Sequence, residues 1–182
     1  MKYCIFIFSL LIALGASAQY STKSKKAIKL FELGKDAPRT SVDRSTGGPN
    51  FRLGIDYMNQ AIEKDPNFWE AHMFAGEFCE YLRQYDEAIN HYKRALEINP
   101  EHSRTGSTYF YLANLQFEVG DYDDAIKNLD IFIRNRNANP ELVTQAHEIQ
   151  ASCDFAKEAI KNPSSFNPIN ICLLYTSDAA DE

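Results

Sequence analysis

The segment from Pro66 to Pro100, PNFWEAHMFAGEFCEYLRQYDEAINHYKRALEINP, limits the possible folds more than any other part of the chain. It has the pattern of two short amphipathic helices joined by a tight turn, and its two prolines are 34 residues apart. Small residues stand where the helices must touch, and large apolar residues follow at helical spacing: Ala75, Gly76, Ala88 and Ala95, then Tyr85, Ile89, Tyr92 and Leu96. Asn99-Pro100 ends the second helix, because proline lacks an amide hydrogen and restricts the residue before it. The pattern predicts a helical hairpin.

The same pattern recurs on both sides of this hairpin. Ala61 precedes Ala95 by 34 residues, so residues 51–64 are predicted to be the second helix of an earlier pair. Its first helix is expected over residues 20–34, ending at Gly34, with a loop from 35 to 50. Downstream, Ala125 follows Ala88 by 37 residues, which places about three inserted residues near 103–106. A last helix over 141–161 has no partner after it, which is typical of a cap.

This period and this order of small and large residues resemble the tetratricopeptide repeat (TPR), whose period is ~34 residues. The resemblance implies an all-α fold, a right-handed superhelical stack of antiparallel helix pairs. Three repeats are expected at about 23–66, 67–100 and 106–140, followed by a capping helix at 141–161. The turn Gly120-Asp121-Tyr122 matches the family better than Arg83-Gln84-Tyr85 does.

The two ends of the chain have a different character. Residues 1–18 carry an early lysine, an apolar run and the ending Ala16-Ser17-Ala18, which predicts a secretory signal peptide and export to the periplasm. The apolar run is shorter than the ~20 residues of a membrane span. Residues 172–182, CLLYTSDAADE, resemble a translated sequencing adapter. We therefore interpret 19–171 as the native domain and expect the gene to continue past about Ile171.

No motif predicts an enzyme, a cofactor site or a metal site. The four histidines are scattered, and HExxH, glycine-rich phosphate loops, Gly-x-Ser-x-Gly and CxxC are missing from the sequence. Glu77 and Glu80 share a helix face near His72 and Cys79, but such carboxylates are usually only solvated. Cys79 and Cys153 are about two repeats apart, so they are expected to be buried free thiols. The net charge of −6 argues against nucleic-acid binding.

The basic cluster near the start of the mature chain has two readings. Lys23, Lys25, Lys26 and Lys29 lie opposite the apolar side of the expected first helix. A solvated face is the favoured interpretation, and contact with a membrane surface is the alternative.

Function is therefore expected from the repeat surface. In the family, the first helix of each repeat lines the concave side, which binds partners. Carried over to this chain, the groove-facing residues are Glu70, Met73, Glu77, Glu80 and Tyr81 in the central repeat, and Ser107, Phe110, Asn114, Phe117 and Glu118 in the next. This acidic and aromatic mixture favours a protein or peptide with basic and apolar side chains. The alternative is that Met73, Phe110 and Phe117 only pack against neighbouring repeats.

Two comparisons within the family sharpen this expectation. A clamp for the carboxylate end of chaperones needs basic or amide groups, and of Met73, Glu77, Phe110 and Asn114 only Asn114 fits. The chain also resembles the start of Bacteroidetes envelope proteins, including a type IX secretion component. The resemblance lies in the signal peptide, the lysine-rich first helix and the segments DPNFWEAH, GDYDDAI and ASCDFAKEAIKNPSSFNPINI. In those envelope proteins, a WD40-like propeller and an OmpA-type peptidoglycan-binding domain follow.

Three functional hypotheses follow from this resemblance. The chain is the N-terminal interaction module of an outer-membrane-associated scaffold, which reaches peptidoglycan only through a missing C-terminal domain. Alternatively it is a stand-alone periplasmic adaptor, or the docking domain of an enzyme whose catalytic domain is missing.

Overall fold

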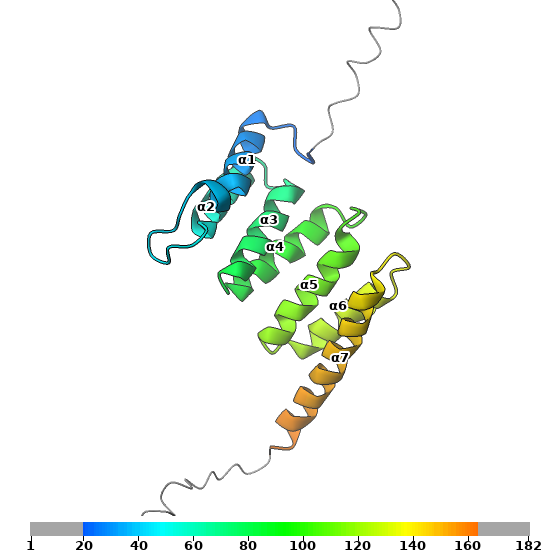
Figure 1. Ribbon diagram of the computed structural model, residues 1–182. Coiled ribbons are helices and arrows are strands. Elements are labelled where there is room, and N and C mark those ends of the chain that lie inside the picture. Colours follow the sequence, from blue (N-terminus) through cyan, green and yellow to red (C-terminus); the bar gives the residue numbers. More distant parts are fainter. Residues whose placement is uncertain (1–19, 164–182) are drawn as a thin grey trace, which may run out of the picture.

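The computed structural model describes residues 20–163, and this part of the chain forms seven α-helices and no β-strand. Figure 1 shows the helices stacked as antiparallel pairs, α1 with α2, α3 with α4 and α5 with α6, and α7 packs on the last pair. The helices are α1 (Lys25–Thr40), α2 (Phe51–Lys64), α3 (Trp69–Tyr81), α4 (Tyr85–Ile98), α5 (Thr105–Glu118), α6 (Tyr122–Ile133) and α7 (Pro140–Lys161). The predicted all-α stack of helix pairs is confirmed.

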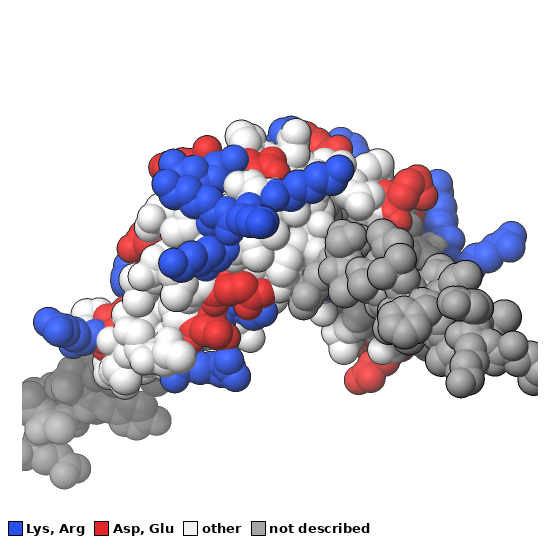
Figure 2. Space-filling view, turned by 90° about the horizontal axis from the view of Figure 1, so that it is seen from above, with Lys and Arg blue, Asp and Glu red and all other residues white. Residues whose placement is uncertain are grey.

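The stack is curved. Viewed from above in Figure 2, it forms an arch with one hollowed side, and Lys and Arg side chains gather on its outer face. Lys23, Lys25, Lys26 and Lys29 are all exposed. Their exposure fits the solvated face favoured from the sequence.

Helix α1 differs from its prediction, because Gly34 does not end it. The helix starts after Ser24, whose side chain accepts a hydrogen bond from the Ala27 amide, and it continues to Thr40. Gly34 is buried against α2, and a Cβ atom there would lie 3.0 Å from the Gly54 carbonyl oxygen. The glycine therefore serves close helix packing, and the loop is shortened to residues 41–50.

Glycine and alanine residues leave room for close packing between helices throughout the stack. A Cβ atom at Gly76 of α3 would lie 2.8 Å from the ring of Tyr92 on α4. At Gly54 of α2 it would lie 2.7 Å from the ring of Phe78 on α3. Ala61, Ala88, Ala95 and Ala125 are fully buried in the same way. The buried side chains form three successive clusters along the stack.

Helix α7 closes the end of the stack. Asn139 caps its start by accepting a hydrogen bond from the Glu141 amide, and Ala146 and Cys153 face the preceding pair without exposure. Its far part leaves Phe155 and Ile160 exposed, at 77% and 69%. Cys79 and Cys153 are both buried, and neither forms a disulfide within residues 20–163, as predicted.

Two sequence predictions fall outside the described residues. The signal peptide at 1–18 and the adapter-like tail at 172–182 both lie beyond the range 20–163. Within that range, none of the helices has the length and apolar character needed to span a bilayer.

Candidate binding groove

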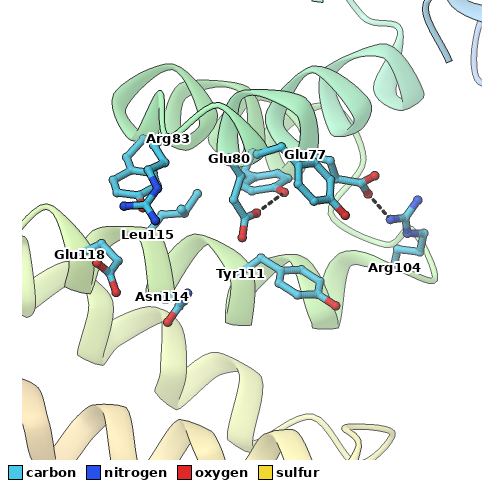
Figure 3. Close-up of a pocket in the computed structure, with 11 residues that line it drawn as sticks. Glu77, Glu80, Arg83, Arg104, Tyr111, Asn114, Leu115 and Glu118 are labelled. Carbon is cyan, nitrogen blue, oxygen red and sulfur yellow. Dashed lines mark hydrogen bonds and ion pairs between the residues drawn. The ribbon is translucent and has the colours of Figure 1, made fainter. Parts of the chain in front are cut away.

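A groove of about 680 Å³ opens between α3 and α5, the first helices of the second and third pairs. Both helices, the α3–α4 turn, α4 and the segment before α5 contribute to it, as Figure 3 shows. The lining residues are Glu77, Glu80, Tyr81, Arg83, Tyr85, Tyr92, Arg104, Tyr111, Asn114, Leu115 and Glu118. We refer to these residues as the α3–α5 groove.

Glu80 lies at the centre of the groove. Its carboxylate accepts a 3.1 Å hydrogen bond from the Tyr92 hydroxyl and points toward α5, where Tyr111 and Asn114 stand (Figure 3). Burial raises the pKa of Glu80, and the nearby Glu77 carboxylate adds to this effect. Within residues 20–163 no Lys or Arg forms an ion pair with Glu80. The groove therefore holds a half-buried carboxylate whose charge is not compensated.

The two arginines of the groove differ in their partners. Arg104 forms an ion pair with Glu77, with 2.5 Å between its Nη2 and the Glu77 Oε1, and lies over the Trp69 ring. Arg83 stands at the other end of the groove, and no ion pair to it is found within the described range. Only Arg83 is thus free to interact with a ligand.

Arg83 also has a strained backbone. Its φ is +58°, and it is the only non-glycine residue of the described range with positive φ. The next turn has the same hydrogen bonds, because Gly120 donates to Phe117 as Arg83 does to Glu80. Gly120 has φ +83° there, which glycine adopts freely. An arginine in this conformation costs about 1 kcal/mol or more relative to glycine.

Tyrosine rings form the walls of the groove. Tyr81 is 70% exposed and stacks on Phe51 with 4.7 Å between ring centroids, and Tyr111 is 39% exposed. Tyr92 is buried, and its burial, together with Glu80, raises its pKa, so it remains a hydrogen-bond donor. The groove can therefore contact both a cation and the apolar stem that carries it.

Comparison with known proteins agrees with this architecture. Residues 70–130 match the family model described as tetratricopeptide repeat. The fold is a TPR stack. A comparison with curated proteins gives no match.

Solved TPR structures superpose on most of the chain. The first TPR of Spaghetti (RPAP3), bound to the HSP90 peptide SRMEEVD, aligns with TM-score 0.59 and 16% identity over 73% of this chain and 97% of that one. The Sgt2 TPR domain from Aspergillus fumigatus aligns with TM-score 0.58 and 15% identity, over 81% and 91%. The Yersinia enterocolitica chaperone SycD, in complex with a peptide of the translocator YopD, gives 0.55 and 16%, over 71% and 93%. At these identities the likeness establishes the fold alone.

Five of the ten residues predicted to face the TPR groove line the α3–α5 groove. Glu77, Glu80, Tyr81, Asn114 and Glu118 all border the same cavity. Asn114 and Glu118 make no side-chain hydrogen bond or ion pair to any residue of the described range, so the fold itself does not use them.

For Met73 and Phe110, the prediction of a groove-facing side chain is wrong. They are 1% and 6% exposed, because Met73 packs in the core between α3, α4 and α5, and Phe110 packs against α6 and α7. The Thr108 hydroxyl contacts the Met73 sulfur at 3.7 Å, and the Phe110 ring lies 5.2 Å from that of Phe132. Their burial matches the packing alternative considered from the sequence.

The other three predicted residues lie outside the groove lining. The Glu70 carboxylate accepts hydrogen bonds from the Ser21 amide at 3.0 and 3.1 Å, which ties the segment before α1 to α3. The Ser107 hydroxyl donates to the Arg104 carbonyl at 2.9 Å. Phe117 is half-buried and packs beside Tyr122.

Sequence reasoning missed several lining residues. Tyr111 precedes Asn114 by three residues and Glu118 by seven, so helical spacing could have placed it on the same stripe. Arg83 lies in the turn that matches the TPR family poorly, and this mismatch is the sequence feature that could have indicated it. Arg104 lies in the inserted stretch, where the repeat pattern predicts nothing.

Two histidines that are scattered in the sequence meet in the structure. The Nδ1 atoms of His72 and His91 are 3.2 Å apart, and His72 Nε2 lies 3.2 Å from the Pro66 carbonyl oxygen. Because the carbonyl only accepts, His72 carries its proton on Nε2, and His91 donates from Nδ1 to His72 Nδ1. Within residues 20–163 no group of three or more His, Cys, Asp or Glu side chains has an arrangement that could hold a metal ion.

Proposed function

We propose that this TPR stack is a non-catalytic protein–protein interaction module that binds an extended partner segment in the α3–α5 groove. The observation that carries this proposal is a cavity of about 680 Å³ in which several charged and amide groups have no charged or hydrogen-bonding partner of their own in the described range. Glu80 lacks a cationic partner, and Asn114 and Glu118 lack any side-chain partner in the described range. Polar groups that the fold leaves unused at a concave surface are available to a ligand.

The groove chemistry favours basic and apolar partners. The solved first TPR of Spaghetti (RPAP3) holds the HSP90 peptide SRMEEVD, which has three acidic side chains. In this chain Glu77, Glu80 and Glu118 stand in the groove, and they would repel such a peptide. The peptide-binding mode of the fold therefore carries over as a proposal, with a ligand of opposite charge.

The cellular setting is a further proposal that rests on the sequence. We place the module in the periplasm, as the N-terminal part of an outer-membrane-associated envelope scaffold. The leader-like residues 1–18 and the resemblance to TPR–propeller–OmpA proteins support this setting. A stand-alone periplasmic adaptor and the docking domain of an enzyme remain the alternatives. A long DNA read across the Ile171–Cys172 junction, with cell fractionation, separates the three.

Blocking the groove tests the binding function. Asn114→Trp fills the cavity from a half-buried position on α5, so it should abolish binding of peptides selected from a random display library on the wild-type chain. Binding is measured by fluorescence anisotropy, and circular dichroism should show unchanged helix content.

Asn90→Trp is the matched control, because Asn90 is exposed on α4 and outside the groove lining. It should bind the selected peptides as the wild type does. Full binding by a folded Asn114→Trp variant would contradict groove binding.

A further inference from the structure

The charges of the α3–α5 groove specify its ligand more narrowly. We propose that the groove selects a segment that places a lysine or arginine side chain against Glu80 and an acidic side chain against Arg83. This inference rests on the proposed binding function and deepens it.

Glu80 is the negative charge in the groove that lacks a cationic partner in the described range. Its carboxylate is half-buried, its one hydrogen-bond donor in the described range is the Tyr92 hydroxyl, and it points into the open groove (Figure 3). A partly buried carboxylate without a cation loses hydration and gains no ion pair in return. A ligand cation at this position would supply the missing partner. The Tyr85 and Tyr111 rings, which also line the groove, would contact the apolar stem of a lysine or arginine.

The neighbouring carboxylate, Glu77, is not the main site for a ligand cation. Glu77 already pairs with Arg104 at 2.5 Å, so the charge at that end of the groove is compensated within the protein. A ligand cation placed there would have to compete with Arg104. Glu80 is therefore the half-buried carboxylate of the groove whose charge is uncompensated in the described range.

Arg83 is the second charged group of the groove that a ligand can contact. The turn before α4 has the same backbone hydrogen bonds as the turn with Gly120, yet it holds an arginine at φ +58°. Strain of this kind is common where a side chain serves binding. Arg83 borders the groove at the end away from Arg104 and has no ion pair in the described range.

One nearby charge works against the second contact. Glu118 borders the same end of the groove, but it is exposed and forms no ion pair with Arg83. Its repulsion of an acidic ligand group is therefore screened by solvent, whereas the planar guanidinium can donate two hydrogen bonds to one carboxylate. Arg83 remains the favoured site for an acidic side chain.

The test is a selection with random 12-residue peptides, displayed without a free carboxyl terminus, on the full chain and its variants. Wild-type peptides should be enriched in a basic residue near an acidic one. Glu80→Gln should remove the preference for the basic residue and weaken the best synthetic peptide at least tenfold. Arg83→Gln and Arg83→Gly should both remove the acidic preference, and Arg83→Gly should also raise the urea midpoint of unfolding.

Controls and outcomes keep this inference separate from the proposed function. Glu63→Gln and Arg44→Gln change exposed charges outside the groove and should bind as the wild type does. Peptides that Asn114→Trp abolishes, but that show no charge pattern and bind Glu80→Gln equally well, would overturn this inference and leave groove binding intact. Peptides that Asn114→Trp does not affect would instead refute groove binding itself. Arg83→Gly with higher stability and unchanged selectivity would overturn the role of Arg83.

Discussion

At the scale of single residues, His72 and His91 form a partly buried contact that disfavours positive charge on the two rings. The Nδ1 atoms are 3.2 Å apart, so protonation of both rings would place two positive charges against each other. Burial lowers the pKa of His72, and burial with the adjacent His72 ring lowers the pKa of His91 to about 4. Glu87 opposes the shift at His91, and Arg94 adds to the shift at His72.

These shifts predict acid sensitivity of the fold. The pKa of an unfolded histidine is about 6.5, so between pH 6.5 and 4 the unfolded chain binds more protons at His91 than the folded chain does. Stability therefore falls as the pH falls through this window, by about 1–3 kcal/mol from the pair. Urea unfolding at pH 7.5 and pH 5 measures the loss.

Substitution of His91 separates the pair from other titrating groups. Asn at position 91 can still donate to His72 but cannot be protonated, so His91→Asn should lose less stability than the wild type on acidification. His147→Asn, at an exposed site on α7, should behave as the wild type does. An identical pH dependence for wild type and His91→Asn would show that the pair does not set acid sensitivity.

At the scale of helices, close packing overrides local propensity. Gly34 lies inside α1, where alanine would be a better helix former by about 1 kcal/mol. Yet a Cβ atom there would lie 3.0 Å from the Gly54 carbonyl oxygen and 3.0 Å from Met58 Cε on α2. A backbone oxygen cannot move aside as a flexible side chain can, so packing should outweigh propensity.

Gly34→Ala is therefore expected to destabilise the protein. Overpacking of this kind typically costs about 1–3 kcal/mol, which exceeds the gain in helix propensity. The free energy of unfolding in urea gives the net effect. Gly48→Ala is the control, because the nearest atom to its new Cβ, Thr46 Oγ1, is 3.6 Å away. A more stable Gly34→Ala variant would mean that α1 and α2 separate at little cost.

At the scale of the whole molecule, stability passes from one helix pair to the next. Each pair contacts only its neighbours, and α7 covers the last pair, including the cluster with Phe110 and Phe132. The cap thus protects the α5 side of the groove even though it does not line it. Binding should then depend on an element that no ligand touches.

Removing α7 should loosen the last repeat first. A chain that stops before Asn139 exposes the apolar surface around Phe110 and Phe132, so α5 and α6 should lose hydrogen-exchange protection while α1 and α2 keep theirs. Peptide affinity should fall with the protection of α5. As a control, Phe155→Ser changes an exposed residue of α7 and should leave exchange unchanged. Uniform loss of protection along the chain would indicate a single cooperative unit.

The helix pairs and their order could be predicted from the sequence. These features follow from hydrophobic periodicity and from small residues at fixed spacing, which local geometry alone imposes. The bounds of α2 agree with the prediction for this reason. The first-helix location of the groove, with Glu77, Glu80 and Asn114, came instead from the resemblance to the TPR family.

Only the tertiary structure decided which side chains reach the groove. Successive residues of a helix point about 100° apart, so the rotation of α5 about its own axis decides which of two neighbouring residues faces the groove. In this structure Phe110 is buried and Tyr111 borders the groove. That rotation depends on how neighbouring repeats pack, as do the close approach at Gly34 and the contact between His72 and His91. The strain at Arg83 is likewise a property of backbone conformation that the sequence showed only as a poorly matching turn. Periodicity determined the stack, and the packing between repeats determined the site.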